Sequence, residues 1–387
     1  MTIFASSLDH YTRRDLRLDR GTRREEQYFD GVRFVLLKTL GYRRNDWRRF
    51  VNMTSYAVNA FQAGIHLLEK PDVIVGSSPH PLAALAALAL ARLKRCRYFF
   101  ELRDLWPEFF LETAVLSKRH PIVPLFRWIV SLCLRHAERV MTVWPDMDTY
   151  LEERGVQRDK AIWIPIGLEF PALDQETPEG PSTRNGQFVA MYRGGFGQSN
   201  DVKTIVDAAR ELQARGQNRI RIVLAGDGVA KPILQEYVRA LALKNVGFES
   251  FVPKNQMGRA LTGADVLLCC LPGLPHFQKY GQIASKLLDY LASGRPTIIA
   301  TNIRDNLVSN ANAGIVVPPE QPRALAEAIM HMATLAPAEL ARMGRNGRNY
   351  VRQHHDITAL ADRVECALIA KSQQRTPVGH GAEEVGR

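Results

Sequence analysis

The chain contains 387 residues, of which 46% are hydrophobic and 24% charged, a composition that excludes a fibrous or intrinsically disordered protein. A chain of this length has room for two domains, each with a core of its own. The net charge of +11 favours anionic partners, such as a membrane surface or a nucleic acid backbone.

In the first half of the chain, short β-rich runs alternate with helical patterns, an order typical of parallel sheets joined by crossover helices. We expect strands at residues 2–6, 32–37, 72–76, 97–102, 139–143 and 161–165. The helices expected between them cover residues 52–69, 81–95, 123–136 and 147–154. These elements predict an N-terminal Rossmann-like domain over residues 1–170.

A Pro- and Gly-rich segment at residues 171–187 has no apolar periodicity and predicts a linker. The alternation then resumes, with strands expected at 188–192, 219–225, 246–248, 265–271, 296–300 and 314–317. Helices are expected at 201–215, 230–241, 255–261, 285–293, 322–336 and 338–355. A second Rossmann-like domain therefore covers 188–355, followed by a crossover helix at 356–371 and a disordered tail at 372–387. Two such domains place a ligand site between the carboxyl ends of their strands.

Arginines interleaved with aromatic residues are concentrated near the N-terminus, at positions 13, 14, 17, 20, 23, 24, 43, 44, 48 and 49. This mixture favours an anionic membrane surface as partner, with a solvated charged face as the alternative. Nucleic acid is disfavoured because no nucleic-acid-binding motif accompanies the charge. We expect no signal peptide, because the N-terminus is polar and Arg-rich, and the longest apolar stretch, residues 81–93, is too short to span a bilayer. We expect a cytoplasmic protein, peripheral at the inner membrane face, with five reduced, scattered cysteines.

Two glycine-rich turns, each after a predicted strand and before a predicted helix, are candidates for phosphate contact. The first contains Gly194, Gly195 and Gly197, and the second contains Gly226. Glycine lets the backbone approach a ligand closely, and the start of the following helix favours an anion. Ordinary tight-turn geometry explains either turn equally well when it is taken alone.

The helix predicted at 285–293 is more informative. Ser285 is its expected N-cap, and Lys286 places a positive charge where the helix dipole disfavours one. A bound phosphate would neutralise that charge. Asp289 lies one turn further on, where its carboxylate can accept hydrogen bonds from ribose hydroxyls. The alternative is an amphipathic helix whose Lys and Asp are merely exposed.

Polar residues also follow two predicted strands of the first domain. His80 comes shortly after one of them, and Arg103 and Asp104 come directly after the next. We treat the three as candidates for acceptor or phosphate contact. In the helix predicted at 123–136, core packing is favoured over membrane contact for the apolar side chains, including Trp128.

The sequence resembles glycosyltransferase family 4, the retaining enzymes with the GT-B fold, and among them bacterial transferases that build O-antigen or capsule polysaccharide. The resemblance covers nearly all of the chain. It is carried by residues 77–80, 101–107, 163–167, 194–197, 226–228, 245–253 and 285–296, the last being the most specific.

The resemblance implies two Rossmann-like domains facing a central cleft, with a C-terminal helix that crosses back to the N-terminal domain. It implies transfer of a hexosyl or N-acetylhexosaminyl group from a nucleotide sugar, uridine-linked, to a lipid-linked saccharide in lipopolysaccharide or other cell-surface polysaccharide biosynthesis. No cofactor is implied. Asp146 and Asp148 match the metal-binding Asp-x-Asp pattern of transferases of another fold, but two carboxylates alone make a poor metal site.

The same resemblance assigns roles to residues. The donor base would lie against the backbone of Phe251 and Val252, and the ribose against Asp289. The diphosphate would lie over the first glycine turn and the start of the helix at Ser285. The residues implied in catalysis are Lys286, Arg103, Asp104 and His80.

Several positions depart from the family pattern. Gly281 stands where the family has the first Glu of an E-x7-E motif, and Asp289 replaces the second. Residues 1–7 look like the second strand of the family, so a central first strand is missing and we expect a split N-terminal sheet. We favour a start further upstream over an impaired chain. The alternatives are a nucleotide-sugar epimerase of the same fold and a catalytically impaired, membrane-associated binding subunit.

Overall fold

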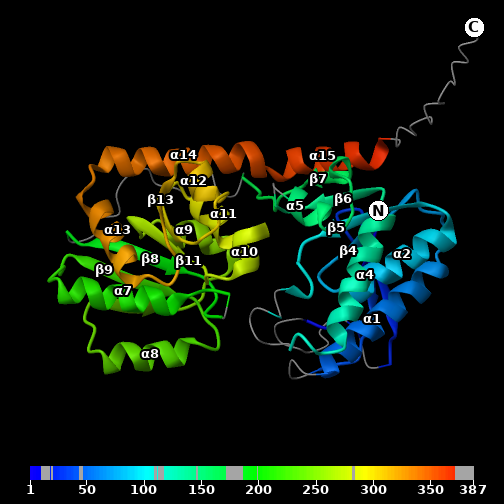
Figure 1. The fold of residues 1–387 in the computed structure, drawn as a ribbon, viewed down its shortest axis with the longest axis horizontal. Helices are drawn as coiled ribbons and strands as arrows, with labels where there is room; N and C mark the ends of the chain where they lie inside the picture. Colours follow the sequence, from blue (N-terminus) through cyan, green and yellow to red (C-terminus); the bar gives the residue numbers. More distant parts are fainter. Residues whose placement is uncertain are drawn as a thin grey trace, which may run out of the picture.

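The computed structural model describes residues 1–9, 18, 21–42, 47–108, 111, 117–144, 147–170, 186–197, 199–280 and 284–370. These residues form two α/β domains built on parallel sheets that are covered by helices (Figure 1). The predicted fold class is therefore confirmed. The linker predicted at 171–187 lies outside the described residues up to position 185, as does the tail predicted at 372–387.

The N-terminal domain contains two sheets. One has the order β1-β3-β2 and consists of β1 (Thr2–Ser6), β2 (Arg24–Phe29) and β3 (Val32–Leu37). The other has the order β4-β5-β6-β7 and consists of β4 (Val73–Ser77), β5 (Arg97–Leu102), β6 (Arg139–Thr142) and β7 (Ala161–Trp163). No pairing joins these sheets among the described strands, which confirms the predicted split.

The strand β2 was not expected from the sequence, and it runs antiparallel to β3. The two residues between these strands, Asp30 and Gly31, both have positive φ angles, of 47° and 77°. A two-residue turn of this kind matches the twist of a hairpin. The expectation of parallel pairing throughout is therefore wrong at this edge of the molecule.

The N-terminal domain contains the helices α1 (Trp47–Ile65), α2 (Pro81–Lys94), α4 (Ile122–His136) and α5 (Asp148–Glu152), with a short turn η1 (Arg158–Lys160) before β7. Helix α1 packs against β3 and α2, whereas α2 and α4 pack on the four-stranded sheet. In α4 the buried positions recur at helical spacing and include Phe126 and Ile129, as expected. Trp128 is 55% exposed, so the expectation of core packing is wrong for this residue. Its position, two residues after Phe126, turns it away from the core.

The C-terminal domain contains one parallel sheet of six strands. They are β8 (Phe188–Arg193), β9 (Ile220–Ala225), β10 (Val246–Glu249), β11 (Val266–Cys270), β12 (Thr297–Ala300) and β13 (Gly314–Val317). Their order is β10-β9-β8-β11-β12-β13. The chain moves outward in one direction from β8 and then in the other from β11. Ligands of open α/β sheets bind at such a reversal, beyond the carboxyl ends of the strands.

Both faces of this sheet are buried. Its helices are α7 (Val202–Ala214), α8 (Lys231–Ala240), η2 (Lys254–Gln256), α9 (Met257–Leu261), α10 (Pro275–Tyr280), α11 (Ser285–Ala292), α12 (Leu307–Asn310), α13 (Pro322–Thr334) and α14 (Pro337–His355). One apolar cluster lies between the sheet and α7, α8 and α13, and another lies between the sheet and α11. The sequence did not predict α10 and α12, which are one to two turns long.

The last helix, α15 (Ile357–Ile369), continues from α14 over the N-terminal domain, as the predicted crossover requires (Figure 1). Asp356 separates the two helices, and its side chain accepts hydrogen bonds from the first amides of α15. The Arg97 guanidinium of β5 donates to the carbonyl oxygen of Ala370 at 2.7 Å and anchors the helix end. Among the described segments, every helix is too short or too polar to traverse a bilayer.

The two domains meet at the carboxyl ends of their sheets. Glu153, the C-cap of α5 after strand β6, accepts hydrogen bonds from Lys279 Nζ at 2.5 Å and from the Tyr280 hydroxyl at 2.7 Å. The Tyr280 ring also packs edge-on against Tyr150 of α5. Because Lys279 and Tyr280 end α10, which follows β11, the polar loops of both domains face the same boundary.

Candidate active site

The N-cap of helix α11 is one residue before the position that the sequence predicts. Ala284 is the N-cap, with an extended backbone, and Ser285 is the first helical residue. The expectation that Ser285 caps the helix is therefore wrong, because its hydroxyl lies one position inside the first turn. Among the described residues, no side-chain hydrogen bond caps this end. The amides of the first turn consequently have no side-chain partner at the cap position.

The side chain of Lys286 joins α11 to the first glycine turn. Its Nζ donates to the Tyr192 hydroxyl at 3.2 Å and to Asn200 Oδ1. A Cβ at Gly194 would lie only 3.0 Å from Lys286 Cε, so the absence of a side chain there makes room for the lysine. Burial lowers the pKa of Lys286. The structure thus brings together two segments that lie more than ninety positions apart in sequence.

The glycines of the two turns differ in what surrounds them. Nothing lies within 4 Å of a Cβ added at Gly195 or Gly197, so these positions border open space. A Cβ at Gly226 would overlap the carbonyl oxygen of Gly194, and Gly226 has a φ of 134°. Close packing of the two turns against each other therefore explains Gly226, without any ligand.

We expect Gly226→Ala to destabilise the fold by about 2–5 kcal/mol, because it adds both a strained φ and a backbone overlap. Urea unfolding followed by circular dichroism would measure this. Gly195→Ala is the matched control, and we expect it to leave the free energy of unfolding within about 1 kcal/mol of wild type. Equal unfolding midpoints for the two variants would contradict the assignment.

Asp289 is a largely buried residue of α11, one turn after Lys286. Its side chain is 17% exposed, and its carboxylate is 3.9 Å from Lys254 Nζ. Burial raises the pKa of Asp289, and the Lys254 charge opposes this effect. Phe251 is 66% exposed in the loop between β10 and Lys254, with Val252 beside it. The predicted base and ribose residues therefore lie in one region, near the end of β10 and the first two turns of α11.

Three residues of this region were not predicted: Tyr192, Asn200 and Lys254. Asn200 also donates to the carbonyl oxygen of Gly195 at 3.1 Å and so connects Lys286 to the turn. Asn200 could have been predicted as a site residue from its position between the glycine turn and Asp201, which caps α7. Lys254 offered no comparable signal, because its approach to Asp289 depends on tertiary packing.

In the N-terminal domain, hydrogen bonds fix the loops that follow β4 and β5. The Ser78 hydroxyl accepts hydrogen bonds from the backbone amides of Arg103 at 2.8 Å and Asp104 at 2.9 Å. His80 Nδ1 accepts from the Ala83 amide at 3.1 Å and caps α2. Because Nδ1 is an acceptor, the neutral imidazole carries its proton on Nε2, where it can donate to a ligand.

The electrostatics of this cluster involve a residue from α1. Burial, assisted by the charge of Arg49, lowers the pKa of His80 to about 4. Burial raises the pKa of Asp104, although its carboxyl reaches solvent, and the charges of Arg103 and Arg49 oppose the rise. Arg49 thus lies beside the predicted site residues, whereas the sequence placed it only in a basic surface segment.

The candidates therefore form two groups on facing sheet ends. Lys286, Asp289 and the glycine turns belong to the C-terminal domain, and His80, Arg103 and Asp104 belong to the other. Asp146 and Gly281 lie outside the described residues. Within the described part of the chain, no group of three or more His, Cys, Asp or Glu could hold a metal ion.

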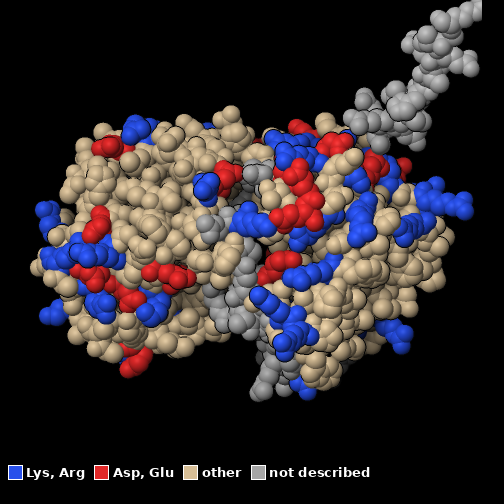
Figure 2. All heavy atoms as spheres, in the orientation of Figure 1, with Lys and Arg blue, Asp and Glu red and all other residues tan. Residues whose placement is uncertain are grey.

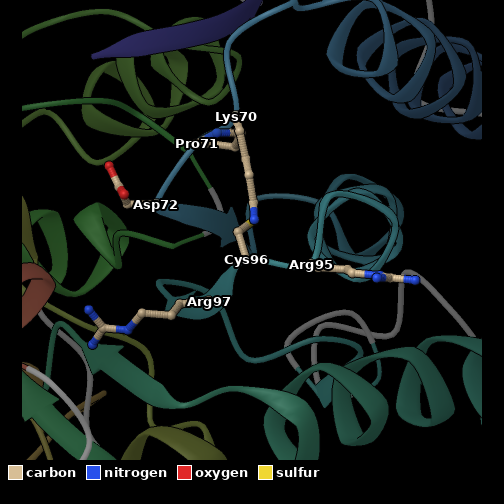
Figure 3. A pocket seen from close by; sticks show the side chains of 6 residues that line it. All are labelled: Lys70, Pro71, Asp72, Arg95, Cys96 and Arg97. Carbon is tan, nitrogen blue, oxygen red and sulfur yellow. The ribbon is translucent and has the colours of Figure 1, made fainter.

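A separate hollow of about 420 Å³ lies at the opposite edge of the N-terminal sheet, where β4 and β5 begin. It is lined by Lys70, Pro71, Asp72, Arg95, Cys96 and Arg97 (Figure 3). The side chains of Arg95 and Arg97 extend in opposite directions, and Arg97 is paired with Glu138 at 2.7 Å. The basic groups do not converge, so this hollow is not a second candidate site.

Comparison with known families identifies both domains. Residues 3–167 match the model described as a glycosyl transferase 4-like domain, and residues 187–335 match the model described as glycosyl transferases group 1. These two matches include strands of all three sheets and the residues of both site groups. The chain therefore belongs to the glycosyltransferases of the GT-B fold that combine these two domains, as the sequence resemblance implied.

The individual proteins that resemble this chain share a quarter or less of its residues over the matched regions. The chain is 24% identical over 179 residues to alpha-D-kanosaminyltransferase of Streptomyces kanamyceticus, a match that covers 46% of this chain and 44% of that protein. Sucrose-phosphate synthase of Thermosynechococcus elongatus has a similar fold, with a TM-score of 0.71, 16% identity and coverage of 95% of this chain and 87% of that one. The Anabaena protein HepE, solved in complex with UDP-glucose, has a TM-score of 0.64 at 15% identity, covering 87% and 85%.

Proposed function

We propose that this chain is a retaining glycosyltransferase. It transfers a hexosyl or N-acetylhexosaminyl group from a uridine-linked nucleotide sugar to a lipid-linked saccharide. The reaction takes place at the cytoplasmic face of the membrane and contributes to a cell-surface polysaccharide such as lipopolysaccharide. Retention of configuration follows the family resemblance, and the uridine follows both that resemblance and the UDP-glucose bound by the HepE protein.

The contact between Lys286 and the Gly194 turn carries this proposal. A cation held against a glycine turn at a helix start suits a diphosphate, which accepts both amide hydrogen bonds and positive charge. Glycosyl transfer leaves the charge of the departing diphosphate to be stabilised, and a fixed cation does this without reorganisation. Lys286 and the helix start supply that charge, so we expect donor binding to persist in the presence of EDTA.

The N-terminal cluster would position the acceptor on the opposite side of the boundary. His80 offers a neutral Nε2 donor, and Asp104 offers a carboxyl that can accept a hydrogen bond from an acceptor hydroxyl. Arg103 and Arg49 add positive charge beside it. A phosphate-bearing lipid-linked acceptor matches that combination of groups.

The donor half of the proposal is tested by Asp289→Ala. We expect the affinity for UDP to fall by about 1.5–3 kcal/mol, or roughly ten- to hundredfold, because hydrogen bonds from the ribose to a charged carboxylate are lost. Isothermal titration calorimetry would measure the change. Asp362→Ala, the same replacement at an exposed position of α15, should bind UDP like wild type. Unchanged affinity in Asp289→Ala would count against this site.

Two other activities have distinct outcomes in a product assay. An epimerase would convert a nucleotide sugar to an isomer in the absence of any acceptor, whereas a transferase would release UDP only slowly under these conditions. An impaired binding subunit would bind UDP without transferring sugar to any acceptor. Chromatography of the nucleotide products, with and without a membrane extract as acceptor source, separates the three.

A further inference from the structure

The starts of α1 and α4 form a surface on which aromatic and basic side chains are mixed. Trp47, the first residue of α1, is 68% exposed, and Trp128 of α4 is 55% exposed. The two helices are in contact here, since the rings of Phe50 and Phe126 lie 6.3 Å apart. Trp47 precedes Phe50 by three residues and Trp128 follows Phe126 by two, so both tryptophans lie in the first two turns of helices that touch there.

Further apolar groups lie close to these tryptophans. Leu125 is 39% exposed and precedes Trp128 by three residues, so both lie on the outer face of α4. Leu40 is 58% exposed, and its carbonyl oxygen accepts a hydrogen bond from Asn52, which places it beside the first turns of α1. Leu40, Trp47, Leu125 and Trp128 come from three segments, and we call them the α1–α4 surface.

Cations surround these apolar groups. The Arg48 guanidinium lies over the Trp47 ring, 5.3 Å from its centre. Lys118 and Arg119 are exposed directly before α4. Arg127 of α4 is exposed as well and lies 3.7 Å from the carboxylate of Glu108. Figure 2 shows Lys and Arg spread over the N-terminal domain on the face in view.

We propose that the α1–α4 surface docks this protein on a bilayer rich in anionic lipid, with Trp47 and Trp128 at the level of the headgroups. Tryptophan favours this level because its ring is apolar and its N–H remains hydrated. Basic residues at the same level are attracted by anionic headgroups. The inference rests on the proposed function, because a lipid-linked acceptor is presented at such a surface.

The location of this surface relative to the site supports the assignment. Arg49 follows Arg48 in the first turn of α1, and its charge acts on both His80 and Asp104. The docking surface therefore adjoins the N-terminal group of site residues. A bilayer bound there brings the headgroup of an acceptor lipid toward Asp104 without any domain having to enter the membrane.

The test uses the full chain and large vesicles of phosphatidylglycerol and phosphatidylcholine, with binding measured by sedimentation. We expect the wild type to bind the mixed vesicles more tightly than phosphatidylcholine alone. Trp47→Ser and Trp128→Ser should each weaken binding about tenfold, as for loss of a partly buried aromatic side chain. Tyr28→Ser, which removes an aromatic that is 66% exposed on β2, is the matched control and should bind like wild type.

Two further measurements test the contribution of the basic residues and the depth of the tryptophans in the bilayer. Lys118→Gln with Arg119→Gln should weaken binding to the anionic vesicles about tenfold or more, while Arg135→Gln, exposed at the far end of α4, should not. Brominated lipid should quench tryptophan fluorescence in the wild type, and this quenching should be reduced in Trp47→Phe and Trp128→Phe.

Three results would overturn the docking surface. These are equal binding to both vesicle types, binding that the two Trp→Ser replacements leave unchanged, and tighter binding to a short DNA duplex that those replacements weaken equally. UDP titration of the same preparations separates the two proposals. If UDP binds and the vesicles do not, the docking surface is wrong while the donor site stands. Loss of the Asp289 effect on UDP would count only against the donor site.

Discussion

We expect the replacement of Lys286 with Met to lower the turnover of sugar transfer by about 10²–10³-fold, the loss that follows when a preorganised donor to a developing anion is removed. The replacement keeps an unbranched chain in the space over Gly194 but removes the charge and its hydrogen bonds to Tyr192 and Asn200. The affinity for UDP falls as well, by about 1.5–3 kcal/mol, because the diphosphate loses a charged partner. Steady-state kinetics and calorimetric titration measure the two effects.

Stability distinguishes this loss from simple misfolding. The pKa of Lys286 is lowered by burial, so holding its charge in the folded chain opposes folding. We therefore expect Lys286→Met to unfold at the same temperature as wild type or at a higher one. Activity would then fall without any loss of stability, as at other sites where function requires an unfavourable buried group. A lower unfolding temperature together with the lost activity would contradict the claim that the buried charge of Lys286 opposes folding.

Asn200 gives a second test of the same arrangement. Its side chain accepts from Lys286 and donates to the Gly195 carbonyl oxygen, so it acts as a positioning residue. Asn200→Ala should reduce turnover less than Lys286→Met does. In the double variant, the two effects on the activation free energy should not add, because the second replacement removes a partner that is already ineffective. Fully additive effects would show that Asn200 acts independently of the lysine.

The residues of the candidate donor site could be placed near one another from the sequence because several local signals agree there. The alternation of strands and helices places the glycine turns and the start of α11 at one sheet edge, and a cation at a helix start is conspicuous in any sequence. The position of Ser285 was missed by one residue, since helix boundaries inferred from sequence carry that uncertainty. Tertiary packing alone decides that Lys286 folds back on Gly194, and no local pattern specifies it.

The N-terminal domain was harder to predict, for two reasons. Arg49 looks like one more surface arginine beside Arg48, yet it lies seven residues before Tyr56, which contacts the His80 ring. Two turns of helix place Arg49 and Tyr56 on the same side of α1, toward the site. The hairpin of β2 and β3 was not predicted although Asp30 and Gly31 form a favoured hairpin turn, because β2 is mostly polar and exposed and lacks the apolar alternation of a half-buried strand.

Acid sensitivity of the fold is the second large effect that we expect, and it comes from His80. The pKa of His80 is lowered from 6.5 to about 4 in the folded chain, by burial and then by Arg49. Between these two pH values the unfolded chain binds more protons than the folded chain. The contribution to stability is therefore complete above pH 6.5 and is lost as the pH falls toward 4, by roughly 3 kcal/mol in all.

The replacement His80→Asn isolates this effect, because an Asn side chain can still accept the hydrogen bond that caps α2. The free energy of unfolding from urea titrations should fall between pH 7 and pH 4.5 by roughly 2 kcal/mol less in this variant than in wild type. Some pH dependence should remain, since burial also lowers the pKa of His355.

His136→Asn is the matched control, because this histidine is exposed at the end of α4. It should retain the wild-type pH dependence in full. If His80→Asn and His136→Asn show the same slope of stability against pH, then His80 already accepts a proton in the folded chain near neutral pH. Its Nε2 proton would then belong to an imidazolium. The acceptor would meet a positive charge at this position instead of the neutral donor that the capping hydrogen bond requires.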